Sequence, residues 1–150
     1  MKVIFLDIDG VLGTNESYER LGGGDKVPFH REAVRNLNRL VEATGAKVVI
    51  SSAWPTDTAE DLRDLFAEQG ACCDIIGTTP VIADGNWFRW KEIMEWLRET
   101  DIQVESFVII DDDCTQIGQH FPDRFVETTM EEGLNKAARP RVTRILNRRS

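Results

Sequence analysis

Acidic side chains stand at two widely separated points of the sequence, each time directly after a run of apolar residues. Asp7 and Asp9 follow one run, Asp111 and Asp112 follow another, and Ser51 follows a third. A phosphomonoester is dianionic, so a carboxylate can attack its phosphorus only where that charge is neutralised. Mg²⁺ neutralises it and prefers hard oxygen ligands, which a group of aspartates supplies together with the nucleophile. The pattern therefore predicts phosphoryl-transfer chemistry with Mg²⁺ as cofactor.

Three of these residues have expected roles in the hydrolysis of a phosphomonoester. Asp7 attacks the phosphorus and forms an aspartyl-phosphate. Asp9 protonates the leaving oxygen and then activates the water that hydrolyses the intermediate, while Ser51 offers its hydroxyl to a phosphoryl oxygen. Acids after a strand can also be turn residues, and a serine there, Ser51 or its neighbour Ser52, commonly caps a loop. The repetition of acids at two strand ends favours the functional interpretation for Asp7 and Asp9.

The elements that must position these residues are strands that alternate with helices. Apolar runs predict strands over residues 2–6, 46–50, 74–77, 107–110 and 124–127. Helical spacing predicts helices after Pro28, after Asp57 or Thr58, and around Ile93, followed by a helical tail that Pro140 interrupts. This alternation indicates an α/β fold with a mainly parallel five-stranded sheet. The carboxyl ends of its strands would bring the acids and the serine into one pocket.

Length and composition fit a single domain that spans residues 1–150. The polar, glycine-rich stretch Gly13–Val27 is expected to be a loop or a small flap. No apolar run approaches the roughly 20 residues that cross a membrane, and the short apolar start is unlike a signal peptide. We expect a cytoplasmic protein that does not act at a membrane.

Charge is unevenly distributed along the chain. The net charge is −8, but the segment Arg139–Ser150 holds five arginines and no acid, which leaves −13 for the first 138 residues. An acidic body argues against broad electrostatic binding of nucleic acid. The basic tail can contact phosphates, or it can be a solvated helix end, because cations also suit a helix C-terminus.

Three segments together resemble motifs of the haloacid dehalogenase (HAD) superfamily. Phe5–Val11 looks like the first motif, a strand followed by Asp-x-Asp-Gly, Ile50-Ser51 resembles the second, and Ile110–Asp112 resembles the fourth, an apolar strand that ends in paired acids. Their order agrees with the family across nearly the whole chain. The resemblance implies a HAD-like Rossmannoid three-layer sandwich and a Mg²⁺-dependent phosphatase.

The resemblance also implies roles for individual residues. Asp7 is the nucleophile and Asp9 the acid/base. Asp7, Asp111 and Asp112 hold the Mg²⁺, and Asp9 contributes its main-chain carbonyl. Gly10, which completes the first motif, is expected beside the phosphate.

The third motif, a Lys or Arg at the start of a helix, can be matched in two ways. Arg89 lies four residues before the apolar Ile93, as the family's spacing requires, and is preferred. Lys91 lies two residues later, on a different helix face, and stays as the alternative. Either cation would offset the charge that develops on the phosphoryl group.

The second motif resembles a subset of the superfamily that is related to polynucleotide-end and RNA-repair phosphatase domains. Ser51, Ser52 and Trp54 form an SSxW-like run and are expected to contact the phosphate or the rest of the substrate. A proline follows the tryptophan, whereas that subset often has an arginine nearby, which weakens the implication for the substrate. Trp54, Trp87 and Phe88 can stack on a base or simply pack in their loops.

The spacing between the motifs leaves no room for the cap domain that HAD enzymes usually carry. An open site suits a large substrate, such as a nucleic-acid end or a phosphoprotein, while a small phosphorylated molecule would need the flap to exclude water. Two other classes of function stay open. One is a phosphoryl-accepting signalling domain, in which a phosphorylated Asp7 would be long-lived, and the other is a non-catalytic HAD-like binding module.

Overall fold

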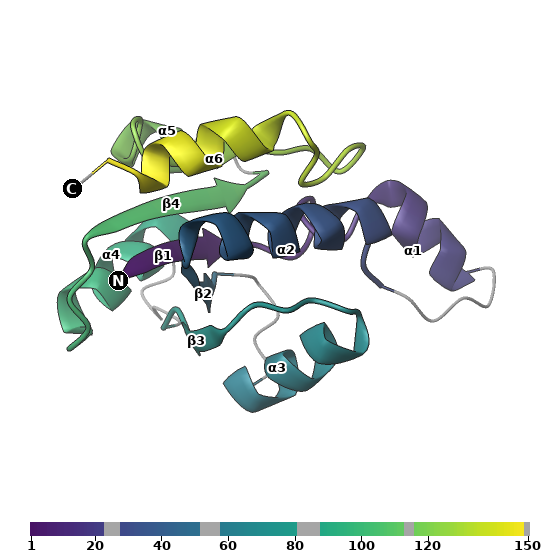
Figure 1. Ribbon diagram of the computed structural model, residues 1–150, viewed down its shortest axis with the longest axis horizontal. Coiled ribbons are helices and arrows are strands. Elements are labelled where there is room, and N and C mark those ends of the chain that lie inside the picture. Colours follow the sequence, from purple (N-terminus) through teal and green to yellow (C-terminus); the bar gives the residue numbers. More distant parts are fainter. Residues whose placement is uncertain (23–27, 52–57, 81–87, 113–115, 149–150) are drawn as a thin grey trace.

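A parallel five-stranded sheet forms the centre of the protein (Figure 1). The computed structural model describes residues 1–22, 28–51, 58–80, 88–112 and 116–148. The strands lie in the order β3-β2-β1-β4-β5, and every neighbouring pair is parallel. They are β1 (Lys2–Leu6), β2 (Lys47–Ile50), β3 (Ile75–Thr78), β4 (Ser106–Asp111) and β5 (Phe125–Glu127). The predicted α/β fold with a mainly parallel sheet is confirmed.

Helices alternate with these strands along the chain. They are α1 (Asn15–Gly22), α2 (Arg31–Thr44), α3 (Ala59–Glu68), α4 (Arg89–Glu99), α5 (Ile117–His120) and α6 (Ala138–Leu146). Gly45 ends α2 in the left-handed conformation, with φ of 72°. Among the residues described, none of the helices combines the length and apolar character that crossing a membrane requires.

Helices cover both faces of the sheet, which gives three layers. Alternate residues of a strand point to opposite faces, so Ile4 and Leu6 join the core beneath α2, α3 and α6. Val3 and Phe5 join the second core, to which α4 contributes Ile93. The Rossmannoid three-layer architecture is therefore confirmed.

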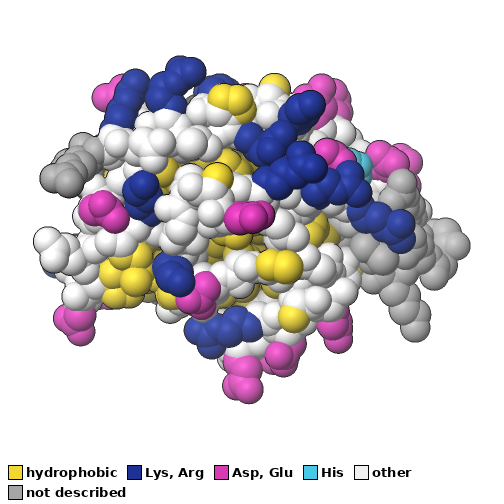
Figure 2. Space-filling model, in the orientation of Figure 1, with side chains coloured by type: hydrophobic (Ala, Val, Ile, Leu, Met, Phe, Trp, Pro, Cys, Tyr) yellow, Lys and Arg dark blue, Asp and Glu magenta, His cyan; other side chains and the backbone are white. Residues whose placement is uncertain are grey.

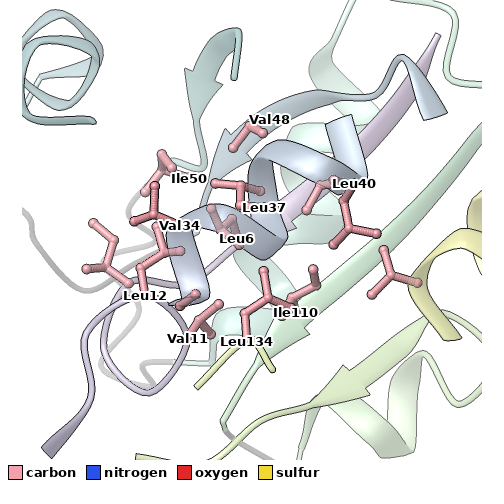
Figure 3. Packing of buried hydrophobic residues seen from close by; sticks show 14 of the residues in the cluster. Leu6, Val11, Leu12, Val34, Leu37, Leu40, Val48, Ile50, Ile110 and Leu134 are labelled. Carbon is pink, nitrogen blue, oxygen red and sulfur yellow. The ribbon is translucent and has the colours of Figure 1, made fainter. Parts of the chain in front are cut away.

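The loop after β1 is anchored in the larger of these two cores. Val11 and Leu12 are fully buried, and Figure 3 shows them beside Val34 and Leu37 of α2 and beside Leu134. Apolar side chains on both sides thus hold the backbone that directly follows Asp7 and Asp9, so the position of these acids depends on core packing.

Two segments differ from the expectation. The stretch expected to be a loop or small flap contains α1, because Thr14 and Ser17 cap each other: the Thr14 N–H donates to Ser17 Oγ at 2.9 Å and the Ser17 N–H donates to Thr14 Oγ1 at 3.3 Å. Pro140 does not interrupt the C-terminal helix. It lies in the first turn of α6, where a main-chain N–H has no partner within the helix.

Candidate active site

Asp7 lies at the carboxyl end of the central strand β1, where its neighbours hold it in one orientation. The residue is 2% exposed. Its N–H donates to the Ile110 carbonyl of β4 at 3.1 Å, and its Oδ1 accepts a hydrogen bond from the Ile8 N–H at 2.8 Å. The second carboxylate oxygen, Oδ2, lies 3.1 Å from a guanidinium nitrogen of Arg89.

Arg89 joins the acids of two strands. It is the first residue of α4, and its Nη1 lies 2.8 Å from Oδ2 and 3.0 Å from Oδ1 of Asp111, the buried last residue of β4. The contacts described for Lys91 are instead with aromatic rings, at 5.1 Å from the Phe88 centroid and 5.6 Å from that of Trp90. Of the two candidates for the third motif, the structure therefore brings Arg89 to the acids.

The electrostatics of this group are strongly coupled. Burial, followed by repulsion from Asp111, raises the pKa of Asp7 to about 8, although Arg89 and the Ile8 N–H act in the opposite direction. Burial alone would lower the pKa of Arg89, but attraction to Asp111 and Asp7 outweighs it and raises that pKa above its ordinary value. The site thus favours additional positive charge beside Asp7.

Three carboxylates are placed so that they could hold a metal ion. Asp7, Asp111 and Asp112 each offer an oxygen, and these oxygens lie within 4.8 Å of one another. A donor set made entirely of carboxylate oxygens suits a hard divalent cation. The Asp9 carboxylate is not in this group, so its expected contribution through the main-chain carbonyl stays a prediction.

Gly10 allows the loop after β1 to lie directly against Asp112. Its φ is +82°, and a Cβ there would lie 2.6 Å from Asp112 Cγ, so any larger residue would displace the carboxylate. Thr128 fixes the same loop from the other side. Its hydroxyl donates to the Gly10 carbonyl at 2.6 Å, and its N–H donates to the Asp111 carbonyl at 2.9 Å.

Ser51 occupies the carboxyl end of the neighbouring strand, β2. Its N–H donates to the Leu6 carbonyl at 2.9 Å, and the residue is 1% exposed. Within the part of the chain that the structure describes, its buried Oγ has no hydrogen-bond partner. A buried hydroxyl without a partner is costly, whereas a phosphoryl oxygen would satisfy it. Ser52 and Trp54, expected beside it, lie outside the described residues.

The Asp9 carboxylate is not one of the three clustered carboxylates and is hydrogen-bonded to α1. The residue is exposed, and the Tyr18 hydroxyl donates a hydrogen bond to its Oδ1. Burial and then this hydrogen bond raise the pKa of Tyr18. Gly13 leaves the space for the ring, because a Cβ there would lie 2.5 Å from Tyr18 Cζ.

Tyr18, Gly13 and Thr128 are the site neighbours that the sequence reasoning missed. The pairing of Thr14 with Ser17 resembles a helix start, and it could have placed Tyr18 on a helix after the first motif. Nothing comparable marks Thr128, whose contact with Gly10 joins residues 118 positions apart.

The aromatic residues expected near the site are described only in part. Phe88 packs on Trp90, with ring centroids 6.1 Å apart and an interplanar angle of 25°. This contact agrees with packing among the side chains of the loop and helix start. Trp87 lies outside the described residues, as Trp54 does.

Comparison with known proteins agrees with this geometry. The family model of the HAD domain in Swiss Army Knife RNA repair proteins matches residues 3–138. None of the curated proteins matches the chain. The matched range contains the acids and cations of the candidate site, and it supports phosphoryl-transfer chemistry of the HAD type. The chain therefore belongs to the family of HAD domains found in Swiss Army Knife RNA repair proteins.

Proposed function

We propose that the protein is a Mg²⁺-dependent phosphatase that removes a terminal phosphate from a nucleic acid through an aspartyl-phosphate on Asp7. The observation that carries the proposal is the ion-paired group of Asp7, Arg89 and Asp111 at the ends of two adjacent strands. Ser51 lies at the end of the strand on the other side of β1. The proposed nucleophile, cation and hydroxyl donor thus lie on adjacent elements at one edge of the sheet, which supports phosphoryl transfer there.

The reaction has two steps. A carboxylate oxygen of Asp7 attacks phosphorus, the bond to the substrate oxygen breaks, and that oxygen takes a proton from Asp9. Asp9 then takes a proton from water, whose oxygen attacks phosphorus as the bond to Asp7 breaks, and inorganic phosphate leaves. Arg89 offsets the charge on the phosphoryl oxygens throughout, and the Ser51 hydroxyl donates to one of them.

Asp9 needs a fixed orientation for both proton transfers. The Tyr18 hydroxyl supplies one hydrogen bond, to Oδ1, and so restricts rotation of the carboxyl group. We assign Tyr18 as a positioning residue, since it acts through Asp9 and not on the substrate.

A donor set of carboxylate oxygens fits Mg²⁺, a hard divalent cation that commonly accompanies phosphate in enzyme sites. Asp7, Asp111 and Asp112 would hold it, with the main-chain carbonyl of Asp9. When bound, the ion supplies charge neutralisation for the phosphate dianion. Asp7 must be ionised to attack, and a cation beside it lowers a carboxyl pKa.

The nucleic-acid substrate is supported by the family to which the chain belongs, since its other members are domains of RNA repair proteins. The described segments between the first and second motifs form α1, α2 and β2, which is compatible with an open site and a large substrate.

Phosphate release tests the proposal directly. We expect Mg²⁺-dependent release from p-nitrophenyl phosphate and from RNA with a 3′- or 5′-terminal phosphate. Asp7→Asn should abolish it, while exposed Asp123→Asn serves as the matched control. Release that persists in Asp7→Asn would contradict the mechanism. A stable phosphoryl-Asp7 without release would favour the phosphoryl-accepting alternative, and a folded protein that releases nothing would favour the binding module.

A further inference from the structure

A basic surface runs along α6 in an otherwise acidic chain. Lys136, Arg139 and Arg144, with Pro140, Thr143 and Asn147, line a shallow open cavity of about 570 Å³. Figure 2 shows a band of Lys and Arg side chains across this face of the molecule, over α6 and the neighbouring α2. Helix α2, which contacts α6, carries the exposed Arg31 and Arg39. We call the three cations of the cavity, Lys136, Arg139 and Arg144, the α6 cations.

The α6 cations are not explained by ion pairing. Some cations elsewhere on the surface have acidic partners, as in Lys47–Asp74 at 3.1 Å or the pair of Arg98 with Glu95. Across the described ranges, none of the α6 cations forms an ion pair, and Arg139 Nε is buried without a hydrogen-bond partner. The charges of the α6 cations are therefore available to an external anion.

Helix electrostatics do not explain them either. Cations are stabilised at the C-terminus of a helix, which accounts for Arg144 in the last turn. Lys136 and Arg139 lie at the opposite end, beside the first residue of α6, where the helix dipole already provides partial positive charge. Cations at this helix end destabilise the folded protein slightly, because they add to the partial positive charge of the helix N-terminus. The resulting positive surface suits a polyanion.

The segment that leads into α6 is hydrogen-bonded to the loop of the active site. The segment between β5 and α6 packs on the loop that follows Asp7, through the hydrogen bond from Thr128 to Gly10 at 2.6 Å and that from the Leu134 N–H to the Val11 carbonyl at 2.8 Å. Asn36 of α2 donates to the Leu134 carbonyl at 2.9 Å. Lys136 and Arg139 follow this segment directly along the chain, where α6 begins.

We infer that the α6 cations bind the phosphate backbone of the single-stranded nucleic acid whose terminal phosphate enters the Asp7 site. This inference rests on the proposed function and adds the path of the substrate. The first 138 residues carry −13, so most of the chain repels a polyanion. The α6 cations then determine along which surface a bound nucleic acid leaves the site. A lipid surface fits less well, since among the described residues the large exposed hydrophobic side chains are Met1 and Met94, neither of them on α6.

Binding of RNA by charge-matched variants tests the inference. Each protein carries Asp7→Asn, so that a fluorescent single-stranded RNA with a terminal phosphate stays intact. We expect Arg139→Gln with Arg144→Gln to weaken binding roughly tenfold at physiological salt. The slope of log affinity against log salt should fall by about 0.7 for each phosphate that the variant no longer neutralises. The control, Lys47→Gln with Arg98→Gln, removes the same charge from other surfaces and should retain affinity and slope.

A second variant and a second assay separate an effect on RNA binding from a change in the fold. Lys136 precedes α6, so Lys136→Gln changes the surface without changing the helix. This variant should also weaken RNA binding. With Asp7 restored, kcat/KM for the RNA should fall about tenfold relative to that for p-nitrophenyl phosphate.

Equal reductions of RNA affinity in the Arg139/Arg144 and control variants would overturn the inference. Failure of the proposed function looks different. If the proposed function fails, Asp7-containing protein releases no phosphate from any substrate, while the Arg139/Arg144 variant still binds RNA more weakly than the Lys47/Arg98 control.

Discussion

At the scale of single residues, Asp7 faces opposing requirements. A buried carboxyl next to Asp111 holds its proton tightly, and these surroundings raise its pKa to about 8. The same carboxyl must be ionised to attack phosphorus. Positive charge from Arg89, 3.1 Å away, and from a bound divalent cation reconciles the two requirements.

This conflict predicts how stability depends on pH. In the unfolded chain the Asp7 carboxyl loses its proton near pH 4, while the folded protein without metal keeps it up to about pH 8. Between these values the unfolded state binds fewer protons, so the free energy of unfolding should fall as the pH rises from about 4 to about 8. Denaturant titrations in EDTA measure this slope. Asp7→Asn should flatten it, and an unchanged slope would contradict the assignment.

The hydrogen bond between Tyr18 and Asp9 predicts a selective effect on catalysis. Tyr18→Phe keeps the ring and removes the hydroxyl, and we expect kcat to fall about tenfold to hundredfold, less than the full acid–base contribution. The decrease should grow as the leaving group becomes more basic, because poor leaving groups depend most on protonation by Asp9. A series of aryl and alkyl phosphates measures this dependence.

A matched variant separates positioning from general damage. Gly13→Ala places a Cβ about 2.5 Å from Tyr18 Cζ, so the ring must move and the same dependence on the leaving group should result. A uniform decrease across all leaving groups would indicate a structural role for Tyr18.

At the scale of elements, the site depends on contacts between segments that follow different strands. The loop after β1 is joined to the segment after β5 by Thr128, whose hydroxyl donates to the buried Gly10 carbonyl at 2.6 Å. Gly10 in turn lies against Asp112. The packing of the Asp7 loop against Asp112 is therefore supported by Thr128, which directly follows β5.

Removal of this hydrogen bond should destabilise the protein and loosen the site together. Thr128→Val keeps the volume and leaves the Gly10 carbonyl without its donor, which we expect to cost about 1–3 kcal/mol. Metal affinity should fall as well, because Asp112 loses its support. Calorimetry with and without Mg²⁺ measures both. Exposed Thr78→Val on β3 is the control, and equal effects of the two variants would contradict the role of Thr128.

At the scale of the whole molecule, metal binding and folding should be linked. The carboxylates of Asp7, Asp111 and Asp112 come together only in the folded sheet, so a bound cation stabilises the folded state alone. Mg²⁺ at about a hundred times its dissociation constant should add about 2.7 kcal/mol to the free energy of unfolding.

Thermal unfolding with increasing Mg²⁺ measures that gain, independently of catalysis. Asp112→Asn should reduce it, because the group then has one negative charge fewer, whereas exposed Asp123→Asn should not. A melting temperature that does not respond to Mg²⁺ would contradict the proposed cation site.

Much of this molecule was predictable from the sequence for a local reason. Runs such as residues 2–6 and 107–110 are wholly or almost wholly apolar, which indicates strands buried on both faces, and their alternation with helical patterns indicates a parallel sheet. Parallel strands collect their carboxyl ends at one edge, so Asp7, Ser51 and Asp111 could be expected to meet. Family membership followed from the same residues. The parallel sheet and the family are both confirmed.

The tertiary structure decided what depends on contacts between distant residues. Sequence spacing left Arg89 and Lys91 both open, and only the position of α4 against β1 and β4 places Arg89 on Asp7 and Asp111. Tyr18 and Thr128 reach Asp9 and Gly10 through packing of α1 and of the segment after β5, which no periodicity reports. Local patterns determine which elements form, because they depend on neighbours along the chain. Side-chain partners depend on how those elements pack, because contact distances are set by the folded core.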